Sequence, residues 1–274
     1  MAFKLFDYQS SGKGVSKSAP QKKPFFKYWE IFGRKFWKLI ELNMLYVLFC
    51  IPIITFGPAT AALTHVMRKF ILEQPCFVFD EFFTAFKKNF KQSVFIGIVD
   101  VIMIVSVWIA CFQFLMNESL PDGSLVFICI MICCATLVFI MHFYIYLEIV
   151  ALNLSIDSIL KNAVFLVFLG VKRNFIALII NLAIISLIVL FLPFSVFAVI
   201  FLPLSLMCFT TTFICYPVIQ KYIVNPYYEE RGERNPELGP ITEEDIAENA
   251  VFVDRGGSEK EIKAAPKAHG KVIK

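Results

Sequence analysis

The sequence predicts an all-α, polytopic membrane protein folded as a transmembrane helical bundle. Hydrophobic residues make up 58% of the 274 residues, against about half in soluble domains, and they gather in long runs. Lys and Arg are concentrated in alternate connections between these runs. Together the two observations indicate three helical hairpins, giving five to six membrane segments joined by interfacial amphipathic helices.

The membrane region follows a basic arm, residues 1–24, whose polar composition is typical of disorder. From Phe25 the stretch "FFKYWEIFGRKFWKLIEL" sets aromatic residues against Lys, Glu and Arg, as helices at a membrane surface do. The apolar run at 36–54 then supplies ~28 Å of helix, which crosses most of a bilayer.

This first run breaks within "NMLYVLFCIPIITFGPATAAL", which carries Pro52, Thr55, Gly57 and Pro58 close together. We interpret "PIITFGPAT" as the tip of a helical hairpin. Pro52 ends the first limb, Gly57 permits the reversal, and Pro58 opens the second limb, where its missing N–H costs nothing. The second limb, residues 59–72, is short, so the hairpin is either a full double crossing or re-entrant. The alternative is one proline-kinked span, giving five spans.

The remaining apolar runs pair into two further hairpins. Interfacial helices, "DEFFTAFKKNFKQS" and "SIDSILKNAVFLVFLG", are expected between the hairpins. The transmembrane domain is thus residues 25–224, and residues 225–274 form a charged cytoplasmic tail, largely disordered. The predicted spans are residues 93–116, 125–151, 175–192 and 195–219.

The charges of the connections predict the orientation. Residues 1–38 hold nine Lys or Arg against two acids, residues 57–93 five against three, and residues 152–174 three against one. The connection "NESLPDG", residues 117–123, has two acids and no base. Because Lys- and Arg-rich short loops stay in the cytoplasm, we expect both termini there, residues 117–123 outside, and the chain in the cell membrane.

Five polar residues interrupt the apolar runs at similar depths, roughly 9–15 Å from the predicted cytoplasmic ends. Asp100 and His142 lie on adjacent limbs of one hairpin and can pair. The set forms either a cytoplasm-facing polar cavity or a layer of polar contacts that hold the helices together. Its members are Asn43, His65, Asp100, His142 and Asn181.

Two acids near the cytoplasmic ends, Glu41 and Glu148, are expected to pair with Lys35, Lys38 or Arg173. Eight cysteines are present without a CxxC pair, and seven of them lie in apolar runs, so we expect free thiols. The chain carries no HExxH, GxSxG or P-loop motif, which argues against an enzyme and predicts no cofactor and no metal site.

The sequence resembles the YesL family of bacterial membrane proteins of unknown function. The matching residues are Asn43, Pro52, Thr55, the segment from Gly57 to Leu63, and the segment from Phe86 to Ser93. The resemblance covers roughly residues 25–225. It implies an association with carbohydrate uptake systems of Gram-positive bacteria, and it supplies no catalytic residue.

The expected function is therefore that of an auxiliary membrane component associated with carbohydrate uptake, acting through protein–protein contacts. The alternative is a small-solute transporter or channel that uses the polar cavity. The expected partners are the lipid bilayer and a carbohydrate transporter or another membrane protein. Nucleic acid is not among them, because the basic arm is suited to anionic lipid headgroups.

Overall fold

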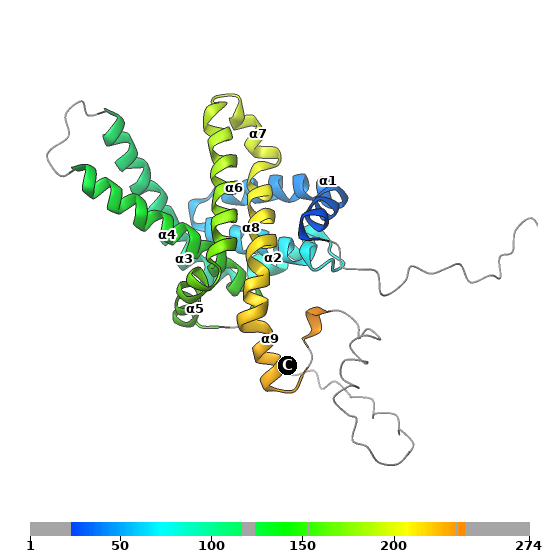
Figure 1. Cartoon of the computed structure of the whole chain (residues 1–274). Helices are drawn as coiled ribbons and strands as arrows, with labels where there is room; N and C mark the ends of the chain where they lie inside the picture. The colour runs from blue at the N-terminus through cyan, green and yellow to red at the C-terminus, as the bar shows by residue number, and fades with distance from the viewer. Residues whose placement is uncertain (1–22, 117–123, 153, 234, 239–274) are drawn as a thin grey trace, which may run out of the picture. The chain divides into compact units, whose positions relative to one another are not determined.

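A computed structural model describes residues 23–116, 124–152, 154–233 and 235–238 of the chain. Within these residues the structure is helical and contains no strand, which confirms the all-α polytopic prediction (Figure 1). The predictions for the basic arm up to residue 22, the connection at 117–123 and the tail from 239 lie outside the described residues. The helices are α1 (Pro24–Cys50), α2 (Phe56–Ile71), α3 (Val78–Met116), α4 (Ser124–Ala151), α5 (Ile156–Leu169), α6 (Val171–Leu190), α7 (Ser195–Phe201), α8 (Pro203–Ile219) and α9 (Asn225–Glu230).

Helices α1 and α2 form a hairpin. The chain turns after Cys50 through a short 3-10 helix, η1 (Ile53–Thr55). The Thr55 hydroxyl lies 2.6 Å from the carbonyl oxygen of Phe49, an otherwise unpaired group in the last turn of α1. The two limbs pack together and are joined by a hydrogen bond of 3.2 Å between the hydroxyls of Tyr46 and Thr60.

Gly57 lies outside this turn, contrary to the role that the sequence suggested for it. It is the second residue of α2 and has no left-handed φ angle. The reversal is made upstream, by the residues between Cys50 and Phe56. Gly57 is required for a different reason, because a Cβ atom there would lie 1.9 Å from the carbonyl oxygen of Ser93 on α3.

Helix α2 is the buried centre of the bundle. Eleven of its sixteen residues are buried, and it packs against α1, α3, α4 and α8. A helix that is covered on most sides must be apolar around most of its circumference, and small residues let its neighbours approach. The stretch "GPATAAL" at its N-terminal half meets both requirements.

Among the described residues, four helical segments are long and apolar enough to cross a membrane. Neither limb of the first hairpin is among them, so the predicted five to six segments comprise four of spanning length plus this hairpin. Helix α2 has only sixteen residues, and α1 carries Lys, Arg and Glu along much of its length. The four segments are Val78–Ala110, Val126–Ala151, Val171–Leu190 and Pro203–Glu230.

The remaining helices differ from the predicted boundaries in three places. The amphipathic stretch predicted at 80–93 is the first part of α3, since no proline separates it from the apolar run. The span predicted at 195–219 is split between α7 and α8, because Pro203 cannot continue a helix hydrogen-bond ladder. The compact helical unit extends to Asn235, so helix continues through α9, beyond the predicted boundary at 224.

Candidate functional site

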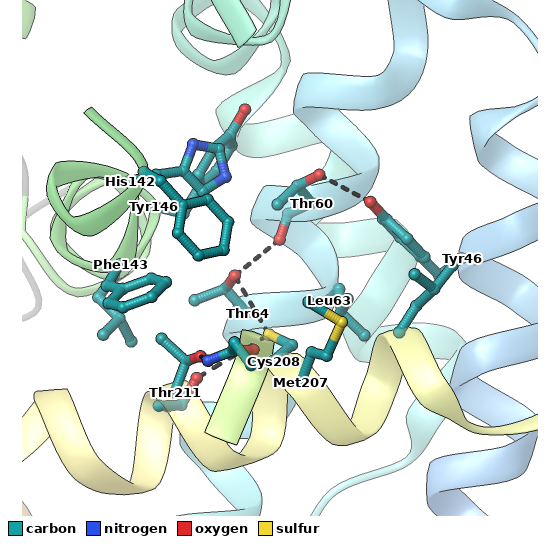
Figure 2. A pocket seen from close by; sticks show the side chains of 15 residues that line it. Tyr46, Thr60, Leu63, Thr64, His142, Phe143, Tyr146, Met207, Cys208 and Thr211 are labelled. Carbon is teal, nitrogen blue, oxygen red and sulfur yellow. Dashed lines mark hydrogen bonds between the residues drawn. The ribbon is translucent and has the colours of Figure 1, made fainter. Parts of the chain in front are cut away.

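A cavity of about 160 Å³ lies inside the bundle, between α1, α2, α4, α6 and α8. Figure 2 shows its fifteen lining side chains, which mix hydroxyl, amide and imidazole groups with apolar and aromatic ones. None of these fifteen described residues is Lys, Arg, Asp or Glu. The polar members are Tyr46, Thr60, Thr64, His142, Tyr146, Asn181, Cys208, Thr211 and Thr212.

The wall formed by α2 carries two threonines one helical turn apart. The Thr60 and Thr64 hydroxyls donate to the carbonyl oxygens of Phe56 and Thr60, each at 2.8 Å. Thr64 also lies 3.7 Å from the Cys208 sulfur on α8 (Figure 2). Because each threonine oxygen keeps acceptor capacity after donating to its own helix, this wall can still accept hydrogen bonds from a solute.

In the wall formed by α4, two side chains are hydrogen-bonded to the buried carboxylate of Asp100. His142 Nδ1 lies 3.0 Å from Asp100 Oδ1, which confirms that the two residues pair across the α3–α4 hairpin. The Tyr146 hydroxyl donates to Asp100 Oδ2 at 2.8 Å. Asp100 does not line the cavity; it orients the two rings that do. A carboxylate at this depth is costly unless it is paired, and here both of its oxygens are.

The third wall joins α6 to α8 through Asn181. Its amide nitrogen donates to the Ala177 carbonyl oxygen at 2.7 Å and to the Thr211 hydroxyl at 2.9 Å. Asn181 is almost fully buried, so these bonds satisfy a group that water does not reach. Of the five polar residues that the sequence singled out, His142 and Asn181 line the cavity and Asp100 supports it.

Asn43 lies elsewhere, at the break between α7 and α8. Its amide nitrogen donates to the carbonyl oxygens of Val199 and Ile200 at 2.8 and 2.7 Å. Its amide oxygen accepts from the backbone N–H of Ser205 at 2.7 Å. One side chain of α1 therefore caps the end of α7 and the start of α8, which satisfies backbone groups that a broken helix would leave unpaired.

His65 also lies outside the cavity. Its Nε2 is 3.3 Å from Glu81 Oε2 at the start of α3, and Lys69 Nζ lies 2.5 Å from the other oxygen of that carboxylate. Through these contacts to the Glu81 carboxylate, the C-terminal half of α2 is bonded to the start of α3. The five predicted residues thus occupy three places in the fold.

Glu148 contradicts the pairing expected for it. It is fully buried on α4, and among the described residues neither of its carboxylate oxygens has a hydrogen-bond partner. The lysines and arginine proposed as partners form no ion pair with it within the described residues, because Glu148 is fully buried in the bundle and not at its surface. Glu41, by contrast, is exposed.

Sequence reasoning missed most of the hydroxyl groups of the cavity. Tyr46 and Tyr146 sit within apolar runs, where a tyrosine is easily read as an ordinary packing residue. A signal was present at Thr60 and Thr64, whose spacing of four places both hydroxyls on one face of an otherwise apolar helix. This spacing alone predicts a polar face on α2, without knowledge of the helices that pack against it.

The side chains that commonly bind metal ions are dispersed in the part of the chain that the structure describes. No group of three or more His, Cys, Asp or Glu side chains there could hold a metal ion. The seven cysteines with described side chains are free thiols, as the sequence predicts, and Cys208 is one of the residues at the cavity.

The described residues, all helical and with four segments long and apolar enough to cross a membrane, define a polytopic, all-α membrane protein. Residues 39–111 match the model of DUF624, a family described as a protein of unknown function. DUF624 is the domain found in YesL-type bacterial membrane proteins, so the match confirms the resemblance to that family. The matched residues include most of the first hairpin and the Asp100 carboxylate. No curated protein and no solved structure matches the chain.

Proposed function

We propose that the protein binds a small, neutral, polar solute in the central cavity, as a transport component of the membrane. The observation that carries this proposal is the lining itself: nine polar side chains and no Lys, Arg, Asp or Glu among the fifteen described residues. Hydroxyl and amide groups beside aromatic rings suit a hydroxyl-rich ligand, because they can both donate and accept hydrogen bonds.

The volume supports a small ligand. The 160 Å³ space is well above the roughly 10–15 Å³ that one water molecule needs, so it has room for several heavy atoms. A solute of a few heavy atoms, or the hydroxylated end of a larger molecule, fits a cavity of this volume. The carbohydrate association implied by the family resemblance is chemically compatible with such a site.

Solute flux into proteoliposomes tests the proposal. We expect the intact protein to accelerate the passage of at least one labelled neutral polyol or sugar, and Thr64→Val to reduce that rate. Thr136→Val is the matched control, because Thr136 donates to its own helix at the same 2.8 Å distance but lies outside the cavity. Flux equal to that of empty liposomes for every solute would contradict the proposal.

A second candidate is the auxiliary role, in which the protein assists carbohydrate uptake by contacting another membrane protein. The observation favouring it is that most of the polar side chains already have protein partners, for instance Asn181 with Thr211 and Tyr146 with Asp100. Such groups can serve mainly to hold the helices. Flux that is absent from the isolated protein, with stable co-purification of a sugar transporter in mild detergent, would favour this role.

A further inference from the structure

A second polar pocket lies where the base of α6 meets the end of α8. Its volume is about 330 Å³, and it shares no lining residue with the central cavity. One side is formed by the segment from Leu169 to Arg173, and the other by Pro217, Val218, Lys221 and Tyr222. Segments nearly fifty residues apart in the sequence therefore build a single pocket.

The charge of the described residues that line this pocket is positive. Lys172, Arg173 and Lys221 all line it, and no ion pair joins any of them to an acid within the described residues. The Lys221 ammonium group lies 5.1 Å from the centre of the Tyr222 ring. Three cations around one pocket attract an anion, and a phosphate group with its several oxygens can contact more than one of them.

The backbone of the pocket is also unusual. Helix α8 contains Pro217, and it passes at Gln220 into a π-helical turn, η2 (Gln220–Val224). The wider turn is closed by the N–H of Asn225, which donates to the Gln220 carbonyl oxygen. Lys221 and Tyr222 belong to this turn. Such π-helical turns occur frequently at functional sites, where they change the direction in which side chains point.

We propose that this pocket binds the phosphate group of an anionic membrane lipid. The apolar spanning segment of α6 begins at Val171, so the pocket lies at the level where the hydrocarbon gives way to headgroups. Exposed Leu169 and Val171 flank it and can contact the upper part of an acyl chain. Tyr222 is partly exposed, as tyrosines at the membrane interface are. The predicted orientation places this end at the cytoplasmic leaflet, which carries anionic lipids.

Lipid binding to the full-length protein in detergent tests the proposal, with labelled phosphatidylglycerol as the probe and phosphatidylcholine for comparison. We expect preferential binding of phosphatidylglycerol, weakened about fivefold for each positive charge removed by Lys172→Gln and Lys221→Gln. Lys161→Gln on α5 is the control, because Lys161 is exposed and lies outside the pocket. Lys221→Arg keeps the charge and should keep the binding.

Two results would overturn the assignment. Equal binding by the double glutamine variant and by Lys161→Gln would show that the pocket does not hold the headgroup. Displacement of phosphatidylglycerol by millimolar inorganic phosphate would assign the pocket to a soluble phosphate ion and not to a lipid.

Discussion

At the residue scale, the polar side chains inside the bundle join helices, face the cavity, or do both. Asn43 and Asn174 belong to the first kind. Asn174 accepts a hydrogen bond from the Tyr144 hydroxyl and donates to the Val167 carbonyl oxygen at 2.9 Å, which links α4, α5 and α6. His142 and Asn181 combine both roles, since each is bonded to a neighbouring helix and also lines the cavity.

The Asp100–His142 pair allows a quantitative test at this scale. Asp100→Ala leaves His142 without its partner, and His142→Ala leaves the carboxylate with Tyr146 alone. Because each single change removes the same contact, the double variant should lose less stability than the sum of the singles, by about 1 kcal/mol. Thermal unfolding of the four proteins in detergent measures this coupling, and strictly additive losses would mean that the contact contributes nothing.

At the element scale, the close approach of α2 and α3 organises the bundle. Ala85, Asn89, Ser93 and Gly97 recur every four residues along α3, and all four are buried. Such a stripe of mostly small residues lets two helix backbones come close together. Gly57 and Gly97 are in direct contact, since a Cβ atom added to Gly97 would lie 2.6 Å from the Gly57 Cα atom.

This contact predicts that Gly57→Ala and Gly97→Ala are both strongly destabilising, by about 2–3 kcal/mol, because either methyl group must push the helices apart. Gly33→Ala is the control. No atom lies within 4 Å of the Cβ position at Gly33, and alanine there improves helix propensity by about 1 kcal/mol. Thermal unfolding in detergent compares the three variants, and tolerance of alanine at Gly97 would argue against the observed packing.

The elements also show how far the sequence could predict this fold. Apolar runs and prolines located most helices, and the spacing of Asp100 and His142 anticipated their contact. The role of Gly57 was not predictable, because it depends on Ser93 and Gly97 of a different helix. The cap that Asn43 provides for the α7–α8 break was hidden for the same reason, since its partners are over 150 residues away. These roles depend on contacts between residues that are far apart in the sequence. The pattern of neighbouring residues does not reveal such contacts.

At the scale of the whole molecule, the first hairpin lies among helices of spanning length. The tip exposes Ile51, Ile53 and Ile54, an apolar surface suited to lipid and not to water. The opposite end of α2 carries Arg68 and Lys69. We propose that the tip of this hairpin enters the membrane and that its base stays at the cytoplasmic surface, which explains both features.

Accessibility of single cysteines to a membrane-impermeant thiol reagent tests this orientation. In a cysteine-free background, Lys88→Cys should be protected in intact cells and react after the cells are opened, because the positive-inside rule places residue 88 in the cytoplasm. Ser119→Cys, in the connection predicted to be external, should react in intact cells. Labelling of Lys88→Cys from outside would reverse the orientation that we propose.

The central claim is that the cavity receives a polar solute, and Cys208 provides the most direct measurement. Cys208 lines the cavity, whereas Cys215 lies two turns further along α8, outside the cavity and fully buried. With each kept as the single cysteine, we expect methyl methanethiosulfonate to modify Cys208 much faster than Cys215. A transported neutral solute should slow the reaction at Cys208 only. If Cys208 proved as unreactive as Cys215, or if no solute that crosses the membrane protected it, the cavity would not be a solute site.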